Sequence, residues 1–280
     1  MRGQTTAVPA SAFFLALAAA FVHALWNLLI ARARDPEAAT AVAVVVAVVA
    51  FAPVAALTWE LEAAAWPYVA ASSAAHLAYF ALLAAAYRRA EVSLVYPLAR
   101  GLAPVLVLVV AVVALGAGTS AGEALGVCVV ALGVLFVRGF RGDADTRGVL
   151  FGLTIAGVIA AYTLVDNEGI EFADPIAYLE VTMFGPAVLY AGAVLAWKGR
   201  APVVADLGPA TVVAGVAMFG AYALVLAALQ LAPAAPVAAV RETSVVIATV
   251  GAALFLGERV GPARYGGAVL VAAGVALLAL

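Results

Sequence analysis

The sequence predicts an all-α integral membrane protein with ten transmembrane helices arranged as two inverted five-helix repeats. Three observations lead to this fold class. Of the 280 residues, 67% are hydrophobic and 11% are charged, with a mean hydropathy of +1.16, whereas soluble domains are about 25% charged. The apolar residues form blocks long enough to cross a bilayer, and the chain aligns with itself at an offset close to half its length.

Ten apolar blocks are bounded by charged residues, proline or glycine, and each is close to the roughly 20 residues that a membrane-spanning helix needs. Trp59, Trp66 and Trp197 fall at block ends, where an indole prefers the headgroup layer. The predicted spans are residues 10–31, 38–58, 66–87, 92–115, 121–137, 148–165, 175–197, 207–230, 232–256 and 261–280.

The internal repeat appears when the chain is shifted by 141 residues without a gap, which aligns Arg100 with Arg241. The same shift aligns Leu115-Gly116 with Leu256-Gly257, and Gly126 with Gly267. Matches between small residues arise easily by chance in a chain rich in alanine, glycine and valine. The evidence for a repeat therefore rests mostly on the paired arginines. We expect one repeat in residues 1–140 and a second in residues 147–280.

Basic residues in the connections predict the orientation in the membrane. Eleven of them lie in alternate connections, and the opposite face holds only Arg2; the eleven are Arg32, Arg34, Arg88, Arg89, Arg138, Arg141, Arg147, Lys198, Arg200, Arg259 and Arg264. By the positive-inside rule these connections are cytoplasmic, and both termini are extracytoplasmic in the cell inner (plasma) membrane. The connection between spans six and seven is acidic instead, with Asp166, Glu168, Glu171 and Asp174. Equivalent loops of opposite charge character are what inverted halves require.

Several functional classes are disfavoured by the sequence. The formal charge is −2 without basic clusters, so we expect no nucleic-acid partner. His23, His76 and Cys128 are too few for a structural zinc site, and we expect no metal or cofactor. The chain has no hydrolase elbow, zinc-protease motif or nucleotide-binding loop, so we expect neither an enzyme nor a pump driven directly by ATP.

Arg100 lies about nine residues inside a predicted span, between Pro97 and Pro104. A guanidinium near mid-membrane costs at least about 2.5 kcal/mol on insertion scales, so Arg100 should face the protein interior and have a partner. Arg241 and Glu242 are adjacent and point about 100° apart on a helix, so they should not neutralise each other well. We therefore expect Glu242 or Glu180 to approach an arginine across helices.

Other polar side chains inside the spans share helical faces and could converge on one cavity. The candidate substrate-binding residues are Arg100, Tyr96, Trp26, Asn27, His76, Tyr79, Tyr162, Tyr222, Arg241 and Glu242. The candidates for proton coupling are His23, His76 and Glu180. For the arginines the alternative is a pair of buried ion pairs that fix helix register, and for the tyrosines it is ordinary packing. Glycines at interface spacing indicate bundle packing or, alternatively, a dimer face.

The motifs resemble those of EamA-type members of the drug/metabolite transporter superfamily. They are His23-Ala-Leu-Trp-Asn27, Ala86-Tyr-Arg-Arg89 followed by Val95-Tyr-Pro-Leu-Ala-Arg100-Gly, and Leu256-Gly257-Glu258 followed by Gly266-Gly267 and Gly274. The resemblance implies two inverted five-helix halves, a central cavity, and export or exchange of small metabolites without a bound cofactor. The chain departs from the family pattern at Ala117, where a glutamate is expected, and it lacks a Tyr-Pro pair before Arg241.

These observations predict a secondary transporter for a small metabolite, such as an amino acid or other carboxylate, that works by alternating access. Arg100 would hold the anionic group. The alternatives are a passive facilitator or channel, and an intramembrane enzyme acting on a lipid-linked substrate. The expected partners are a small-molecule substrate and membrane lipids, with the protein a monomer or homodimer.

Overall fold

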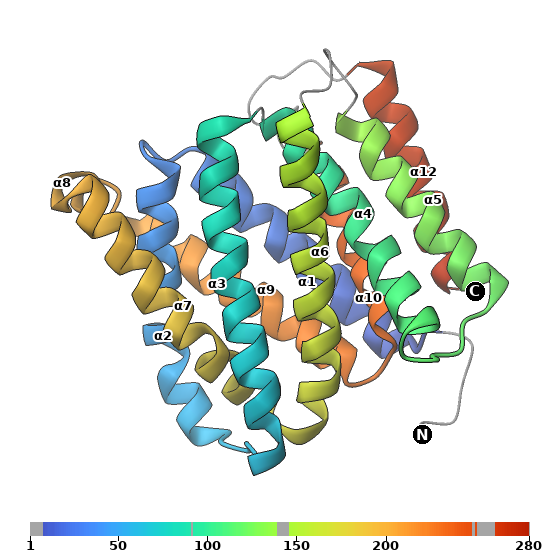
Figure 1. Ribbon diagram of the computed structural model, residues 1–280, viewed down its shortest axis with the longest axis horizontal. Coiled ribbons are helices and arrows are strands. Elements are labelled where there is room, and N and C mark those ends of the chain that lie inside the picture. Colours follow the sequence, from blue (N-terminus) through green and yellow to red (C-terminus); the bar gives the residue numbers. More distant parts are fainter. Residues whose placement is uncertain (1–7, 91, 139–145, 248–249, 251–260, 280) are drawn as a thin grey trace.

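A computed structural model describes residues 8–90, 92–138, 146–247, 250 and 261–279. Within these residues the regular structure is helical, apart from an isolated β-bridge between Leu61 and Ala173. Figure 1 shows the helices side by side in one bundle. The first half contains α1 (Ala10–Ala31), α2 (Pro36–Leu57), α3 (Trp66–Arg89), α4 (Val92–Val113) and α5 (Ala121–Arg138).

The second half contains α6 (Thr146–Gly169), α7 (Pro175–Lys198), α8 (Arg200–Ala205), α9 (Pro209–Leu229), α10 (Ala234–Arg241) and α12 (Pro262–Ala279). Two 3₁₀ turns, η1 (Ala63–Ala65) and η2 (Ile170–Phe172), lie in the connections. Five helices are long and apolar enough to cross a membrane: α1, α2, α6 with η2, α7 and α9. Shorter apolar helices cover residues 98–113, 121–136 and 265–278. The chain is therefore an integral membrane protein, and the count of ten spans stays a prediction.

Helices α2 and α7 begin in the same way. Asp35 accepts hydrogen bonds from the backbone amides of Glu37 and Ala38, and Asp174 accepts them from Ile176 and Ala177. In both cases proline follows the aspartate, which suits the first helical position because that position needs no amide donor. The Asp-Pro pairs thus fix the same boundary in each half.

The two halves pack against each other in reciprocal pairs. α1 packs on α9 as α6 packs on α3, and α2 packs on α9 as α7 packs on α3. α2 also packs on α7, and α5 packs on α12. Replacing each first-half helix by its counterpart in the second half reproduces these pairs, so the packing has the symmetry that a structural repeat produces.

The direction of the repeats follows from the bridge between Leu61 and Ala173, which joins the connection after α2 to the connection after α6. The backbone amide of Glu62 donates to the carbonyl of Phe172, and that of Asp174 donates to Glu60, which extends this contact. α2 and α6 therefore end at the same end of the bundle, whereas α1 ends at the opposite one. Helices α1 and α6, which begin the two halves, run in opposite directions.

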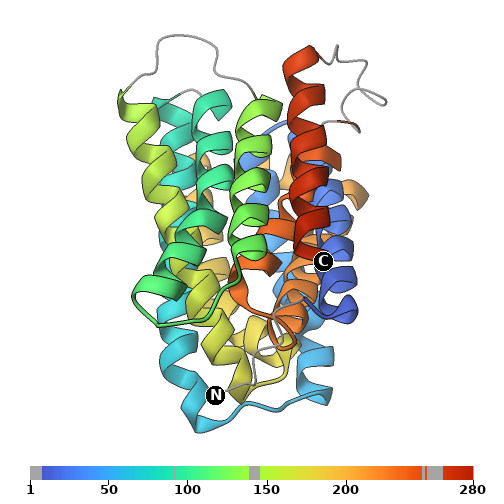
Figure 2. The ribbon, with the colours of Figure 1, turned by 90° about the vertical axis from the view of Figure 1, so that its right-hand side faces the viewer.

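Glycine allows α5 and α12 to lie in close contact, as Figure 2 shows. A Cβ atom built on Gly274 would lie 2.7 Å from the backbone nitrogen of Val130, and one on Gly126 would lie 3.1 Å from the carbonyl of Gly274. Any side chain at these positions would force the helices apart. These glycines therefore serve packing within the chain.

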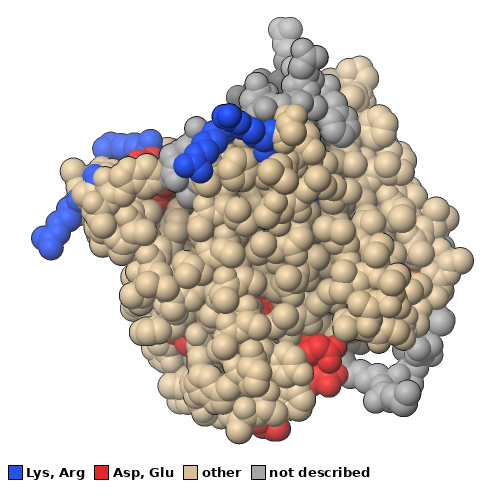
Figure 3. All heavy atoms as spheres, viewed as in Figure 1, with Lys and Arg blue, Asp and Glu red and all other residues tan. Residues whose placement is uncertain are grey.

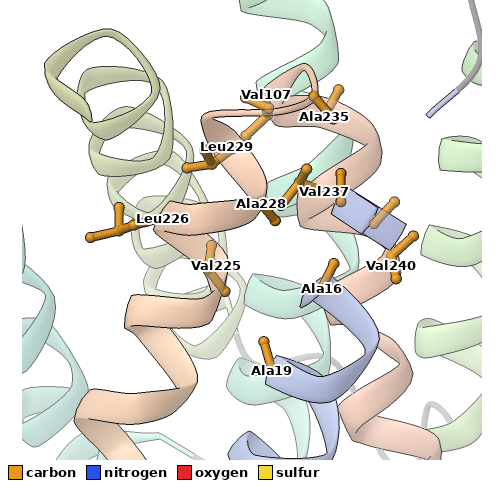
Figure 4. Packing of buried hydrophobic residues seen from close by; sticks show 14 of the residues in the cluster. Ala16, Ala19, Val107, Val225, Leu226, Ala228, Leu229, Ala235, Val237 and Val240 are labelled. Atoms are coloured by element: carbon orange, nitrogen blue, oxygen red, sulfur yellow. The ribbon is translucent and has the colours of Figure 1, made fainter. Parts of the chain in front are cut away.

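The apolar core lies where α1, α4, α9 and α10 meet. Val107, Leu226 and Val237 are each at most 1% exposed, and Ala16 packs with them. Figure 4 shows buried side chains of the four helices in this region. The core brings α4 and α10, which carry the two arginines, next to each other.

Charged side chains and exposed apolar side chains lie on different parts of the outer surface. On the face that Figure 3 shows, basic side chains lie at one end of the bundle, the larger acidic areas lie toward the other end, and most of the surface between them is uncharged. Large apolar side chains such as Phe14, Val49, Phe184 and Val269 are more than half exposed on the helices. An apolar surface of this kind is stable against lipid and not against water.

Candidate functional site

Arg100 is buried inside the bundle on α4, with 5% of its surface exposed. Its Nη2 atom lies 2.6 Å from Nε2 of His23 on α1, and its Nη1 atom lies 3.4 Å from Oε1 of Glu242. Both contacts join different helices, so the prediction of an interior arginine with a partner on another helix is confirmed. A guanidinium at this depth needs such partners because lipid offers none.

The helix that carries Arg241 is broken at the next residue. α10 ends at Arg241, Glu242 adopts a turn conformation, and helical structure resumes at residues 243–247. The amide of Val245 donates to the carbonyl of Glu242, which closes the turn. Discontinuous helices with polar residues at the break mark binding sites in several transporter folds.

The break also brings two neighbouring side chains closer together than a continuous helix would, although not to hydrogen-bond distance. Adjacent residues of a continuous helix point apart, yet Nη2 of Arg241 lies 3.6 Å from Oε1 of Glu242. The turn at Glu242 explains how the neighbouring side chains reach each other. Glu242 is thus shared between Arg100 and Arg241.

This cluster contains more positive than negative charge. Arg241 is 2% exposed and Glu242 is fully buried, and both arginines approach the same carboxylate oxygen. Among the described residues, Nε and Nη2 of Arg241 and Oε2 of Glu242 have no hydrogen-bond partner. Buried donors without acceptors are costly, at about 1–3 kcal/mol each. The arrangement would accommodate an additional anionic group.

His23 connects Arg100 to Trp26. Nε1 of Trp26 lies 3.2 Å from Nδ1 of His23, while Nε2 faces Arg100. A neutral imidazole has one acceptor nitrogen, so only one of these two donors can be hydrogen-bonded at a time. An imidazolium has no acceptor, so protonation of His23 would require Arg100 to move. Asn27 donates to the carbonyl of His23 at 2.8 Å and is held on its own helix.

Four predicted aromatic residues come together across α3, α6 and α9. The ring of His76 stacks on Tyr162 at a centroid distance of 4.3 Å and meets Tyr222 edge-on at 5.5 Å. Tyr162 meets Tyr222 at 5.9 Å and Tyr79 at 6.3 Å. The cluster forms a wall between helices from both halves, as the shared helical faces predict.

Asp166, which the sequence places at the boundary between span six and the acidic connection, belongs to this cluster. Helix α6 continues to Gly169, and Asp166 is fully buried. Its two carboxylate oxygens accept hydrogen bonds from the hydroxyls of Tyr178 at 2.9 Å and Tyr222 at 2.5 Å. The signal in the sequence is the four-residue spacing from Tyr162 at the end of the predicted span, which puts both residues on one face of α6.

Three candidate residues are placed differently. Glu180 is buried on α7, its Oε2 atom has no hydrogen-bond partner among the described residues, and no described ion pair joins it to an arginine. Tyr96 lies on α4, and its side chain falls outside the described residues. Trp26 packs with Ile30 and Met218 on the side of α1 toward α9.

The described residues contain no group of three or more histidine, cysteine, aspartate or glutamate side chains suited to a metal ion. They do form a groove of about 520 Å³ between α1, α2, α9 and the start of α7, lined by residues such as Val22, Phe51 and Leu224. Its lining is almost entirely apolar, so it differs in character from the arginine cluster.

The fold has been observed in other proteins. One structure, titled only as the crystal structure of a protein, superposes with a TM-score of 0.76 over 96% of this chain and 98% of that chain. The sequences are 15% identical, so this likeness concerns the fold alone. No curated protein sequence matches the chain.

A family match covers nearly the whole chain. The sequence model of the EamA-like transporter family matches residues 10–139 and again residues 146–280. Each match spans one half of the chain.

Proposed function

Because the chain belongs to the EamA-like transporter family, we propose that it is a secondary transporter that exports or exchanges a small carboxylate, such as an amino acid. Transport would proceed by alternating access around a central cavity between halves 1–140 and 147–280, which we propose to be inverted repeats. The reciprocal helix pairs and the opposite directions of α1 and α6 support this arrangement. The work comes from substrate or ion gradients, since the sequence contains no nucleotide-binding loop.

The observation that carries the proposal is the pair of buried arginines sharing one carboxylate. If the cluster served only to fix helix register, one arginine would be enough to neutralise Glu242. The second guanidinium would then be left without a full counter-charge. Buried charges persist when they are paired or when they serve function. A substrate carboxylate can form two parallel hydrogen bonds with a guanidinium, and this pairing would satisfy Arg241.

The two arginines have different roles in this proposal. Arg100 is held by His23 and Glu242 and positions the cluster. Arg241 binds the anionic group of the substrate through the nitrogens that lack acceptors. The aromatic cluster of His76, Tyr162 and Tyr222 would contact the remainder of the substrate.

We further propose that the protein resides in the plasma membrane with its basic connections in the cytoplasm. Two interactions at that end join the connection after α1 to the second half. Lys198 contacts both Asp35 and Glu37 at 2.7 Å, and Asp206 accepts hydrogen bonds from the amides of Arg34 and Asp35. These contacts would have to break when the cytoplasmic side opens.

The proposal is tested by a thermal-shift screen of the purified protein with small carboxylates, amines and neutral metabolites. A ligand that binds only the folded state raises the apparent unfolding temperature. We expect stabilisation by carboxylates and not by matched amides, with loss of the effect in Arg241→Gln and no loss in the exposed-residue control Arg32→Gln. Carboxylate stabilisation that survives in Arg241→Gln would contradict the assigned role.

A further inference from the structure

Glu180 is a buried carboxyl group for which the described residues provide no counter-charge. It lies on α7 with 9% of its surface exposed, and its Oε2 atom has no hydrogen-bond partner within that part of the chain. The described ion pairs use Asp35, Glu37 and Glu242 instead, and Asp166 receives hydrogen bonds from two phenols. A buried charge without partners is far more costly than a neutral group, so the protonated form of Glu180 is the stable one in this conformation.

Glu180 lies on the face of α7 that packs on α2, which is a contact between the two halves. Ala187 and Ala191 follow it by seven and eleven residues, which puts all three on one face of the helix. Ala187 packs in one cluster with Val44 of α2. Ala191 packs with Ala41 of the same helix. Glu180 therefore belongs to the part of α7 that meets the first half.

The internal repeat supports this placement. Ala41 and Glu180 each lie six residues after the aspartate that caps their helix, Asp35 for α2 and Asp174 for α7. Since α2 and α7 have equivalent places in the packing and Ala41 contacts α7, Glu180 has the equivalent place toward α2. The first half fills this place with a small apolar side chain, so the packing of the two helices does not itself require a carboxyl group.

The neighbouring turns of α7 offer Glu180 an apolar environment. Ile176, one turn before it, lines the apolar groove together with Phe51 of α2. Met183, one turn after it, packs against the cluster that contains Val44. A metal cation needs several oxygen ligands, and these side chains provide none. A proton needs only the carboxylate itself.

Other titratable groups on the surrounding helices have partners elsewhere. Tyr178 and Tyr222 donate to Asp166, and Lys198 forms its ion pairs at the far end of α7. The titratable and charged groups of α7 and of the helices packed on it are Glu37 on α2; Tyr68, His76, Tyr79, Tyr87, Arg88 and Arg89 on α3; Arg200 on α8; Tyr222 on α9; and Tyr178, Tyr190 and Lys198 on α7 itself.

The two histidines that the sequence suggests for proton coupling are less suited to this role than Glu180. Nε2 of His23 lies 2.6 Å from Nη2 of Arg100, so a proton on this nitrogen would bring two positive charges together. Nδ1 of His76 lies 3.0 Å from the carbonyl oxygen of Ser72, and this contact satisfies the neutral ring. Of the three candidates, Glu180 gains most from taking up a proton.

We propose that Glu180 is a proton-binding site and that closure of the contact between α2 and α7 takes up one proton, an inference that rests on the proposed transport function. When the halves separate on one side, water reaches this contact and the carboxyl group can release its proton to water. If the helices closed on the ionised carboxylate, it would lose that water and gain no counter-charge. Closure therefore follows protonation, and a rise in pH makes closure less frequent.

The first test is labelling of the intact protein in lipid with an apolar carbodiimide, which reacts with protonated carboxyl groups, followed by mass spectrometry. We expect an adduct on Glu180 at neutral pH that decreases as the pH rises, and none on Glu242, which two arginines hold in the charged form. The proposal is overturned if Glu180 is unlabelled at neutral pH, if its labelling is the same at acid and alkaline pH, or if sodium ions suppress the labelling at constant pH. No substrate is needed for this measurement.

The second test is the pH dependence of counterflow with a carboxylate that binds in the thermal-shift screen and stays ionised throughout. The wild-type rate should fall by up to about tenfold per pH unit on the alkaline side, because the protonated fraction of a carboxyl group falls by that factor. Glu180→Gln resembles the neutral acid, so it should lose this dependence and exceed the wild-type rate at alkaline pH. Glu168→Gln, the same exchange at an exposed residue, should keep the wild-type profile.

The two tests distinguish failure of the proton site from failure of the proposed transport. A pH dependence that persists in Glu180→Gln, or a wild-type rate that does not change with pH, would contradict the proton site. A misfolded variant cannot imitate the expected result, because that result is a gain in rate. Labelling of Glu180 as expected, without counterflow of any carboxylate by the wild type, would contradict the transport function alone.

Discussion

Replacing Arg241 by glutamine separates a structural role of this residue from a binding role. The guanidinium is 2% exposed, and its Nε and Nη2 atoms lack hydrogen-bond acceptors among the described residues. Its contact with Glu242, at 3.6 Å, exceeds hydrogen-bond distance. Each buried donor without an acceptor costs about 1–3 kcal/mol, so removal of the charge should leave stability unchanged or raise it by about 1–3 kcal/mol.

Glu242→Gln is the matched comparison, and it should have the opposite effect on stability. It leaves Arg100 and Arg241 buried without their shared counter-charge. Breaking a buried ion pair by removing one partner costs about 3–5 kcal/mol. The two variants alter adjacent residues by one charge each, so the difference between them reports pairing and not the location of the change.

The assay is thermal or chemical unfolding of both variants in the same detergent, with and without a carboxylate that stabilises the wild type. We expect Arg241→Gln to retain wild-type stability and to lose the ligand response. If Arg241→Gln lowered the stability as much as Glu242→Gln, Arg241 would be a structural ion-pair partner. The binding role assigned to it would then be wrong.

Three further predictions concern packing, charge and orientation. Gly274→Ala should destabilise by about 1–3 kcal/mol because its Cβ would lie 2.7 Å from a backbone nitrogen of α5; Gly220→Ala, with no atom within 4 Å, should not, and equal unfolding temperatures would contradict this. Burial acts to raise the pKa of Asp35, but hydrogen bonds from Lys198 and two backbone amides outweigh it and hold the pKa below its ordinary value. The partly exposed pair should therefore contribute about 0–1 kcal/mol above the ordinary pKa and lose it as the pH falls through the lowered one. Asp35→Asn keeps a helix-capping residue, so its stability curve should meet that of the wild type at acid pH, and curves that stay apart would refute the assignment. A reporter fused after Leu280 should indicate the extracytoplasmic side, and a cytoplasmic signal would reverse the orientation.

Much of the fold could be predicted because lipid imposes a simple rule on the sequence. Apolar blocks and the residues that interrupt them gave most helix bounds to within a few residues, and the helix contacts agree with two halves packed against each other. The exception is span 232–256, because α10 ends at Arg241 and the predicted end of this span lies outside the described residues. The interior position of Arg100 followed from the cost of a charge in hydrocarbon. Glycines spaced for close packing were correctly read as bundle contacts at Gly126 and Gly274, whereas a dimer face stays untested.

The site was harder to predict, because its geometry depends on tertiary contacts and on a local break in a helix. A regular helix at Arg241 and Glu242 would separate their side chains, and no proline or glycine in that sequence announces the turn. Asp166 lies just past the predicted end of span six, so the sequence could relate it to Tyr162 by spacing but could not show that it is buried. The phenols that make its burial tolerable come from α7 and α9, 12 and 56 residues further along the chain.

The account depends most on Arg241 binding the anionic group of a transported substrate. Counterflow measures this directly: vesicles containing the protein are preloaded with a carboxylate found in the ligand screen, and entry of the same labelled compound is followed. We predict transient, saturable accumulation with the wild type and with Arg32→Gln, and none with Arg241→Gln. Accumulation by Arg241→Gln at the wild-type rate, or unsaturable entry with the wild type, would contradict the proposed carrier.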